Sequence, residues 1–164
     1  MRSYDSKILT TEALAKRRAE LKSKGKTLVF TNGCFDILHT GHVDYLAYSR
    51  SLGDALVVGI NSDASVRKNE GVKRPIVPQD ERARMLASLE CVDFVTLFDM
   101  PEPLELICAV LPDVLVKGSD WAHNVVGREI VEANGGRVAL ATLTPGWSTS
   151  EIIRRIRDAY SDGE

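Results

Sequence analysis

Residues 31–42, with the sequence TNGCFDILHTGH, combine residue types that bind phosphate. Gly33 follows an apolar run, so backbone amides at this point can approach a ligand closely. His39 and His42 lie where the next helix is expected to begin. A helix start offers unpaired N–H groups and the positive end of the helix dipole, and two imidazoles beside it can donate hydrogen bonds to the same anion. The segment therefore predicts a site for a phosphorylated ligand.

The two histidines also allow other interpretations, which must be compared with the phosphate site. An H-x-x-H pair is also typical of a helix cap followed by one buried, hydrogen-bonded histidine. A zinc site would need a third histidine or a cysteine at ligand spacing, which the sequence lacks. The chain has neither G-x-x-x-x-G-K-[ST] nor G-x-G-x-x-G, so P-loop and dinucleotide-binding chemistry lose support. The glycine-bearing loop before a helix start favours phosphate, and we predict no protein-held metal.

Polar side chains also follow two other apolar runs. Lys117, in VKGSDW, would point its charge into a crevice beyond the sheet, unless it is a snorkelling surface lysine. Trp121 can stack on a ligand or cover its loop. Asn61 and Asp63 end another apolar run, although Asp63 can instead cap the helix that follows.

Two further segments could hold phosphate. Residues 67–74 (RKNEGVKR) are cationic, which is typical of either a solvated loop or a mobile flap over phosphates. Ser148 and Glu151 have the spacing of a helix capping box, and a capped helix start is also an anion site.

These candidates need a scaffold that brings them together. Near-continuous apolar runs predict strands at 27–31, 55–61, 92–98, 113–118 and 137–142. Helices are expected at 10–24, 41–52, 78–91, 101–111, 124–134 and 150–160. This alternation predicts an α/β fold, a doubly wound, Rossmann-like, five-stranded parallel sheet with a short N-terminal helix. We expect a leader at 1–26 and one domain at 27–164, with ligands beyond the carboxyl ends of the strands.

Composition narrows the partners. The 164 residues are 44% hydrophobic and 27% charged with a net charge of −2, which argues against a nucleic-acid-binding protein. Residues 27–164 hold thirteen basic and twenty acidic side chains, so a few placed cations must meet any anion. No apolar run reaches the ~18 residues of a membrane span, and the N-terminal residues MRSYDSKILTTEALAKRR have charge but no apolar core, so they are not expected to be a signal peptide. Three scattered cysteines without a C-x-x-C pair indicate a reducing, cytoplasmic setting.

Residues 31–42 resemble the H-x-G-H signature of the nucleotidylyltransferase superfamily. Within that superfamily, nearly the whole chain is similar to the bacterial D-glycero-β-D-manno-heptose 1-phosphate adenylyltransferases. The segments that carry this similarity are TNGCFDILHTGHVDYL, LGDALVVGINSDASV, KRPIVPQDERARML, LPDVLVKGSDW, ANGGRVAL and STSEIIRRI. The segment KILTTEALAKRRAELKSKGKTLVF resembles the one that precedes this domain in bifunctional kinase–adenylyltransferases. Because no kinase half is present, the chain is expected to be the stand-alone form.

The resemblance implies transfer of AMP from ATP to heptose 1-phosphate, giving ADP-heptose and pyrophosphate by direct in-line attack on the α-phosphate. It implies Mg²⁺ with ATP, a homodimer, and a product used in lipopolysaccharide assembly. The implied catalytic residues are His39, His42 and Lys117. The implied nucleotide-binding residues are Thr31, Asn32, Gly33, Cys34, Phe35, Gly41, Gly118, Asp120, Ser148, Thr149 and Ser150. The implied substrate- and phosphate-binding residues are Asp36, Asn61, Asp63, Lys68, Lys73 and Arg74.

One departure from a related family bears on the nucleotide. Glycerol-phosphate cytidylyltransferases carry RTEGIST where this chain has LTPGWST at 143–149, so the arginine that helps to hold cytidine is missing. ATP is therefore favoured over CTP. A glycerol-3-phosphate cytidylyltransferase, another sugar- or polyol-phosphate nucleotidylyltransferase, and a non-catalytic nucleotide-binding module stay open as alternatives.

Overall fold

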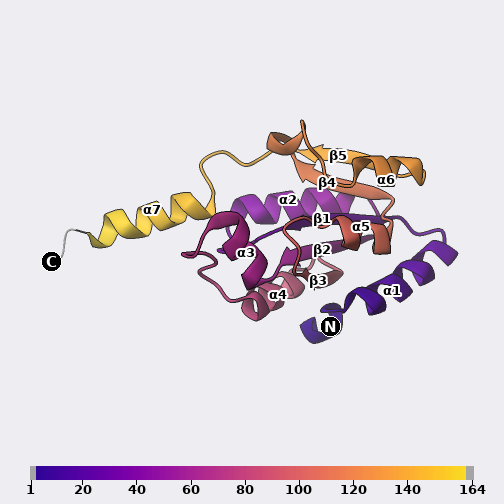
Figure 1. The fold of residues 1–164 in the computed structure, drawn as a ribbon, viewed down its shortest axis with the longest axis horizontal. Coiled ribbons are helices and arrows are strands. Elements are labelled where there is room, and N and C mark those ends of the chain that lie inside the picture. The colour runs from indigo at the N-terminus through magenta and orange to yellow at the C-terminus, as the bar shows by residue number, and fades with distance from the viewer. Residues whose placement is uncertain (1–2, 162–164) are drawn as a thin grey trace.

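The computed structural model describes residues 3–161, which are built around a five-stranded sheet (Figure 1). Its strands are β1 (Leu28–Gly33), β2 (Ala55–Asn61), β3 (Phe94–Phe98), β4 (Val114–Gly118) and β5 (Arg137–Ala141). All neighbours pair in parallel, in the order β3-β2-β1-β4-β5. The predicted doubly wound parallel sheet is confirmed, because the chain leaves β1 toward one edge and later returns to its other side.

This reversal positions the site. The central strand β1 pairs with β2 on one side and with β4 on the other, with Thr31 opposite Val116. The segments that follow β1 and β4 therefore leave the sheet side by side at its carboxyl edge. A crevice at such a switch point is the usual ligand site of open parallel sheets.

Helices cover both faces of the sheet. The helices α2 (Thr40–Ser51) and α4 (Gln79–Ser88) pack on one face, and α1 (Thr11–Ser23), α5 (Leu104–Val110) and α6 (Arg128–Ala133) pack on the other. Along β1, Val29 belongs to the first apolar layer, whereas Leu28 and Phe30 belong to the second. Two-sided burial explains why the strands are nearly continuous runs of apolar residues.

Several predicted boundaries are wrong. Residues 67–70 belong to helix α3 (Asp63–Glu70) rather than to a loop or flap, because Ser62 caps that helix by accepting from the Ser65 amide at 3.2 Å. The cap is thus Ser62 and not Asp63. The helices predicted at 101–111 and 124–134 are shorter than expected. Leu111 ends α5 with a φ of 44°, and Gly127 precedes α6 with a φ of 86°.

The N-terminal leader is packed against the body. It contains a short 3₁₀ helix, η1 (Tyr4–Lys7), followed by α1. Leu14 is fully buried, and the Arg18 guanidinium pairs with Asp113 at 2.7 Å. The Leu9 amide donates to the Val95 carbonyl of β3 at 2.8 Å. The division into a leader and a domain stays a prediction, since these contacts join the two.

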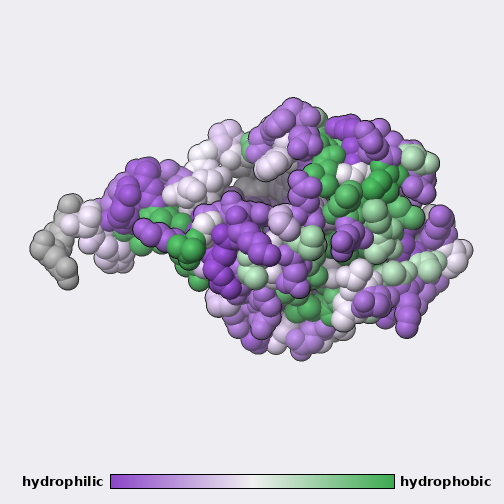
Figure 2. Space-filling model, viewed as in Figure 1, coloured by the Kyte–Doolittle hydropathy of each residue, from purple (hydrophilic) through white to green (hydrophobic). Residues whose placement is uncertain are grey.

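The last helix, α7 (Thr149–Tyr160), has a different environment. It projects from the rest of the molecule (Figure 1), and none of its residues is buried. Figure 2 shows hydrophobic side chains on it beside hydrophilic ones. Within residues 3–161, no helix has both the length and the apolar character that crossing a bilayer requires.

Candidate active site

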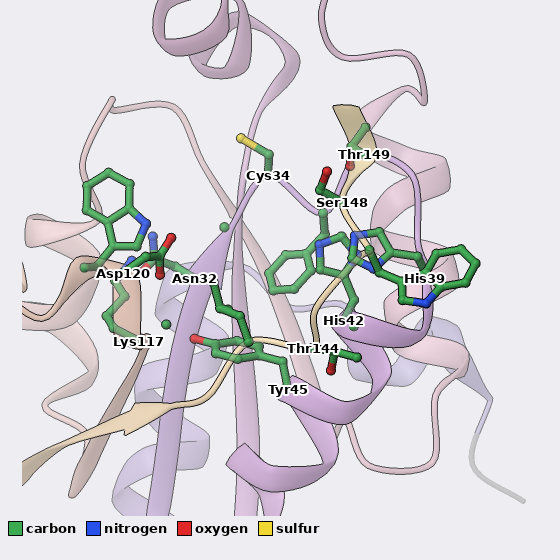
Figure 3. A pocket seen from close by; sticks show the side chains of 17 residues that line it. Asn32, Cys34, His39, His42, Tyr45, Lys117, Asp120, Thr144, Ser148 and Thr149 are labelled. Carbon is green, nitrogen blue, oxygen red and sulfur yellow. The ribbon is translucent and has the colours of Figure 1, made fainter. Parts of the chain in front are cut away.

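A cavity of about 300 Å³ opens at the carboxyl ends of β1 and β4. Most of its lining comes from segments that the sequence singles out. These residues are Asn32, Gly33, Cys34, Phe35, His39, Gly41, His42, Lys117, Gly118, Asp120, Ser148 and Thr149. Figure 3 shows His39, His42, Ser148 and Thr149 on one side, Lys117 and Asp120 on the other, and Asn32 and Tyr45 between them. The fold thus brings together residues 117 positions apart in sequence.

The two histidines form a stacked pair. Their ring centroids are 3.8 Å apart with 23° between the planes. His39 is the N-cap residue of α2, but its side chain makes no capping hydrogen bond, so the interpretation of this residue as a side-chain cap is wrong. A Cβ atom at Gly41 would lie 3.0 Å from Nδ1 of His39, so glycine leaves room for the ring.

Burial keeps this pair neutral. Desolvation, together with the smaller effect of the neighbouring His39, lowers the pKa of His42 to about 4. Desolvation also lowers the pKa of His39. At neutral pH each ring is therefore a neutral imidazole with one N–H to donate and one nitrogen to accept.

Several residues that line the cavity have buried polar atoms without partners. In the described part of the chain, four buried side-chain nitrogen or oxygen atoms lack a hydrogen-bond partner: Asn32 Oδ1, His39 Nδ1, His42 Nδ1 and Thr96 Oγ1. Three of these belong to residues that line the cavity. Buried polar groups in native proteins are nearly always paired, so their concentration in the lining residues marks this cavity as the candidate functional site.

Lys117 supplies the positive charge of the cavity. Among the described residues it is the one lysine or arginine in the lining. Desolvation lowers its pKa to about 8, against the opposing effect of Asp120. Its Nζ lies 6.0 Å from the ring centroid of Trp121. A cation that faces a cavity at this depth is unlike a snorkelling surface lysine.

The start of α7 closes another side of the cavity. The Ser148 hydroxyl accepts from the Glu151 amide at 3.1 Å, which confirms the predicted cap. Ser148 and Thr149 line the cavity, whereas Ser150 does not. The free amides of this helix start are therefore close to the two histidines.

Cys34 is held as a thiol. Its Sγ donates to a Glu70 carboxylate oxygen at 2.9 Å. Burial and the neighbouring Glu70 raise the pKa of Cys34 to about 12. At neutral pH Cys34 is therefore a protonated thiol and does not act as a thiolate nucleophile.

The structure places several predicted site residues away from the cavity lining. They are Thr31, Asp36, Asn61, Asp63, Lys68, Lys73, Arg74 and Ser150. The carboxylate of Asp36 accepts from the Ile76 and Val77 amides at 2.8 Å and pairs with Arg74. The Arg74 guanidinium thus neutralises a buried carboxylate. The substrate contacts of Arg74 and Asp36 stay predictions, and binding would have to compete with this pair.

Four lining residues were not predicted from the sequence: Tyr45, Leu143, Thr144 and Trp147. A fifth, Trp121, was expected either to stack on a ligand or to cover its loop, and it lines the cavity. Tyr45 lies one helical turn after His42, which is the signal that could have revealed it. Its hydroxyl bonds the Thr31 hydroxyl at 2.6 Å and the Val116 carbonyl at 3.2 Å, so it joins β1 to β4 beneath the cavity. Trp147 stacks under Arg155, whose Cζ lies 4.9 Å from its ring centroid.

The residues offer little for a protein-held metal. No group of three or more His, Cys, Asp or Glu side chains within residues 3–161 could hold a metal ion. Asp120 is the carboxylate in the cavity lining among those residues.

Comparison with known proteins gives one family and several relatives. The family model described as cytidylyltransferase-like matches residues 30–155. The bifunctional protein HldE of Syntrophotalea carbinolica is 53% identical over 161 residues, which cover 98% of this chain and 33% of that protein. That of Citrifermentans bemidjiense is 55% identical over 157 residues, 95% of this chain and 32% of the relative. The chain thus spans about a third of the length of these relatives.

Solved structures show the same fold. The lipopolysaccharide core biosynthesis protein from Thermoplasma volcanium superposes with a TM-score of 0.60 at 30% identity, covering 73% of this chain and 98% of that one. The pantoate-β-alanine ligase from Francisella tularensis, complexed with an ATP analogue and β-alanine, gives a TM-score of 0.65 at 18% identity. It covers 90% of this chain and 72% of the ligase, and at that identity the likeness concerns the fold.

Proposed function

The chain belongs to the cytidylyltransferase-like family, and from this premise we propose that it transfers AMP from ATP to D-glycero-D-manno-heptose 1-phosphate. The products are ADP-heptose and pyrophosphate. The nucleotide follows from the residues at 143–149, and the sugar follows from the resemblance along the whole chain. The similarity to the lipopolysaccharide core biosynthesis protein from Thermoplasma volcanium supports a role in surface-glycan assembly.

The observation that carries this proposal is the cluster of unpartnered polar groups at the switch point. Nδ1 of His39 and His42 faces no acceptor or donor among the described residues, and Lys117 lies across the same cavity. A polyphosphate suits this lining, because it can accept from imidazole N–H groups and neutralise a desolvated lysine.

The proposed reaction needs no covalent intermediate with the protein. An oxygen of the sugar phosphate attacks the α-phosphorus of ATP, the bond to the bridging oxygen breaks, and pyrophosphate leaves with its electron pair. The histidine pair and Lys117 act by donating to phosphate oxygens as negative charge develops on them. The amides at the starts of α2 and α7 hold the polyphosphate in line for attack.

We assign Mg²⁺ to the nucleotide rather than to a protein cage. Mg²⁺ keeps several water ligands and commonly binds phosphate oxygens with one or two carboxylates, and Asp120 is the carboxylate that the cavity offers. When bound, the ion would neutralise charge on the polyphosphate.

We also propose a homodimer in the cytoplasm. The exposed apolar residues of α7, with Ile156 at 52% and Tyr160 at 83% exposure, support an interface. The three free cysteines support a reducing compartment. Sedimentation of the purified chain tests the dimer.

Pyrophosphate release tests the reaction. Each nucleoside triphosphate is paired in turn with heptose 1-phosphate, glycerol 3-phosphate and phosphopantetheine. The proposal expects release with ATP and the heptose. Release with CTP and glycerol 3-phosphate alone would assign a polyol-phosphate cytidylyltransferase. No release with any pair, despite nucleotide binding, would leave a binding module.

A further inference from the structure

Arg82 of α4 is a fully buried cation beside the site. Its side chain is 0% exposed, and its guanidinium donates four hydrogen bonds. The acceptors are the carbonyl oxygens of Cys34 at 2.6 Å, Asn61 at 2.9 Å and Val77 at 3.0 Å, and Oδ1 of Asp63 at 2.8 Å. One side chain thus ties together the loop after β1, the end of β2, the start of α3 and the segment that enters α4.

Stability alone is a poor explanation of this arrangement. Desolvating two charges offsets most of their attraction, and a well-packed apolar side chain is often as stabilising as a buried ion pair. Asp63 is the one acidic partner, and 25% of its side chain is exposed. The other three acceptors are neutral backbone carbonyls. What the guanidinium fixes is the direction of peptide groups.

The shortest of the four bonds acts on the cavity loop. In a planar trans peptide the C=O and N–H groups point in opposite directions. The bond from Arg82 to the Cys34 carbonyl therefore turns the N–H of Phe35 away from α4. That N–H donates to no acceptor among the described residues, and Phe35 lines the cavity. Phe35 also has a φ of 49°, a left-handed conformation that a residue with a side chain adopts only when its surroundings hold it there.

We propose that Arg82 is a positioning residue, which holds the Cys34–Phe35 peptide so that the Phe35 amide faces the nucleotide phosphates. This proposal rests on the proposed function, because the Phe35 amide needs a nucleotide phosphate to accept its hydrogen bond. Arg82 itself lies outside the cavity lining and touches no reacting atom. Arg82 acts through the Cys34–Phe35 peptide group. It makes the Phe35 N–H a preorganised donor, whose orientation is set before the ligand binds.

The test compares Arg82→Lys and Arg82→Gln with Leu86→Ala. Leu86 is fully buried one turn further along α4, in the apolar layer, so its truncation is a matched control for loss of stability. Each variant is assayed well below its melting temperature for kcat, KM and the Kd of ATP without acceptor. The Arg82 variants should lose kcat by about tenfold or more and bind ATP several-fold more weakly, because a Phe35 amide that points elsewhere no longer donates to the phosphates. Leu86→Ala should lower the melting temperature and leave kcat and Kd within about twofold of wild type.

Equal kcat and Kd in folded Arg82 variants and wild type would overturn the positioning role. If the Arg82 variants do not fold, the Phe35 amide is followed by NMR in ¹⁵N-labelled wild-type protein during ATP addition. A marked shift of this amide supports the proposal, and an unmoved resonance at saturating ATP overturns it. Wild-type protein that binds ATP but releases no pyrophosphate refutes the proposed reaction alone, because the Kd comparison still decides the role of Arg82. Wild-type protein that binds no ATP refutes both.

Discussion

The imidazole rings of His39 and His42 stack face to face, 3.8 Å between centroids, with Nδ1 of each ring unpartnered among the described residues. The two rings pack against each other, and both residues line the same cavity. This stacking also opposes protonation of either ring, since two adjacent imidazolium ions repel each other.

Replacing His42 by alanine tests the pair as donors. The removal of one such donor typically costs about 2.7–4 kcal/mol of barrier, so turnover should fall roughly a hundredfold to a thousandfold. The melting temperature should change little, because the Nδ1 atom of His42 has no partner to lose among the described residues. His123→Ala, at an exposed position outside the cavity, is the matched control and should keep wild-type turnover. Activity that survives in His42→Ala would make the pair structural.

Acid should destabilise the protein through His42. Its pKa falls from 6.5 in the unfolded chain to about 4 in the fold, mainly by desolvation. The unfolded state therefore binds more protons between these values, and the stability present above pH 6.5 is lost as pH falls toward 4. The full loss is about 3 kcal/mol at 1.36 kcal/mol per pKa unit. Urea unfolding at pH 7 and pH 4.5 should show a smaller decline in His42→Asn, and identical declines would count against this origin.

ATP binding should take up a proton at Lys117. In the protein without ligand this amine has a pKa of about 8, and a neighbouring polyphosphate raises it by favouring the charged form. Near pH 8.5 calorimetry in two buffers of different ionisation enthalpy should reveal this uptake. Lys117→Met should abolish the buffer dependence and weaken both binding and turnover. Buffer-independent heats in the wild type would mean that the lysine does not meet the phosphates.

The cap of α7 should matter to nucleotide binding more than to global stability. Ser148→Ala removes the acceptor for the Glu151 amide and costs the helix about 1 kcal/mol. Because none of the residues of α7 is buried, this loss should fray its first turn without unfolding the body. The KM for ATP should rise several-fold. Ser161→Ala, at the other end of the same helix, is the control, and an equal effect there would argue against a local role for the cap.

The layout of this fold is readable from its residues. Apolar strands punctuated by helices dictate a parallel sheet, and the reversal of strand order follows from right-handed connections. Beyond a possible cap at Asp63, no range was predicted for helix α3, because its sequence DASVRKNE is polar and only Ser62 as a cap and Val66 as a buried anchor mark it. Pairs of side chains that are far apart in sequence could not be predicted in this way. Arg74 pairs with Asp36, which lies 38 residues away, and no residue near Arg74 in sequence indicates this partner.

The same limit applies to the site. The loop after β1, the histidine pair and Lys117 were identified because strand ends of a parallel sheet converge on one edge. Arg82 escaped notice because an arginine on a helix is ordinarily solvent-exposed, and two of its three carbonyl acceptors, Cys34 and Asn61, lie far from it in sequence. Trp147 and Leu143 became part of the lining only when the chain after β5 folded back over the cavity.

The short contact of the leader with β3 has a consequence for self-association. β3 is one edge of the sheet, and an edge strand with free backbone groups can pair with another molecule. The Leu9 amide donates to the Val95 carbonyl of this strand. Just before the strand, Lys7 Nζ donates to the carbonyls of Leu89 at 3.0 Å and Val92 at 2.7 Å. The contact is one residue pair long, between Ile8 and Val95, so it occupies one position of the edge strand and does not itself form a new strand. The leader thereby reduces the number of backbone groups that this edge offers to another molecule.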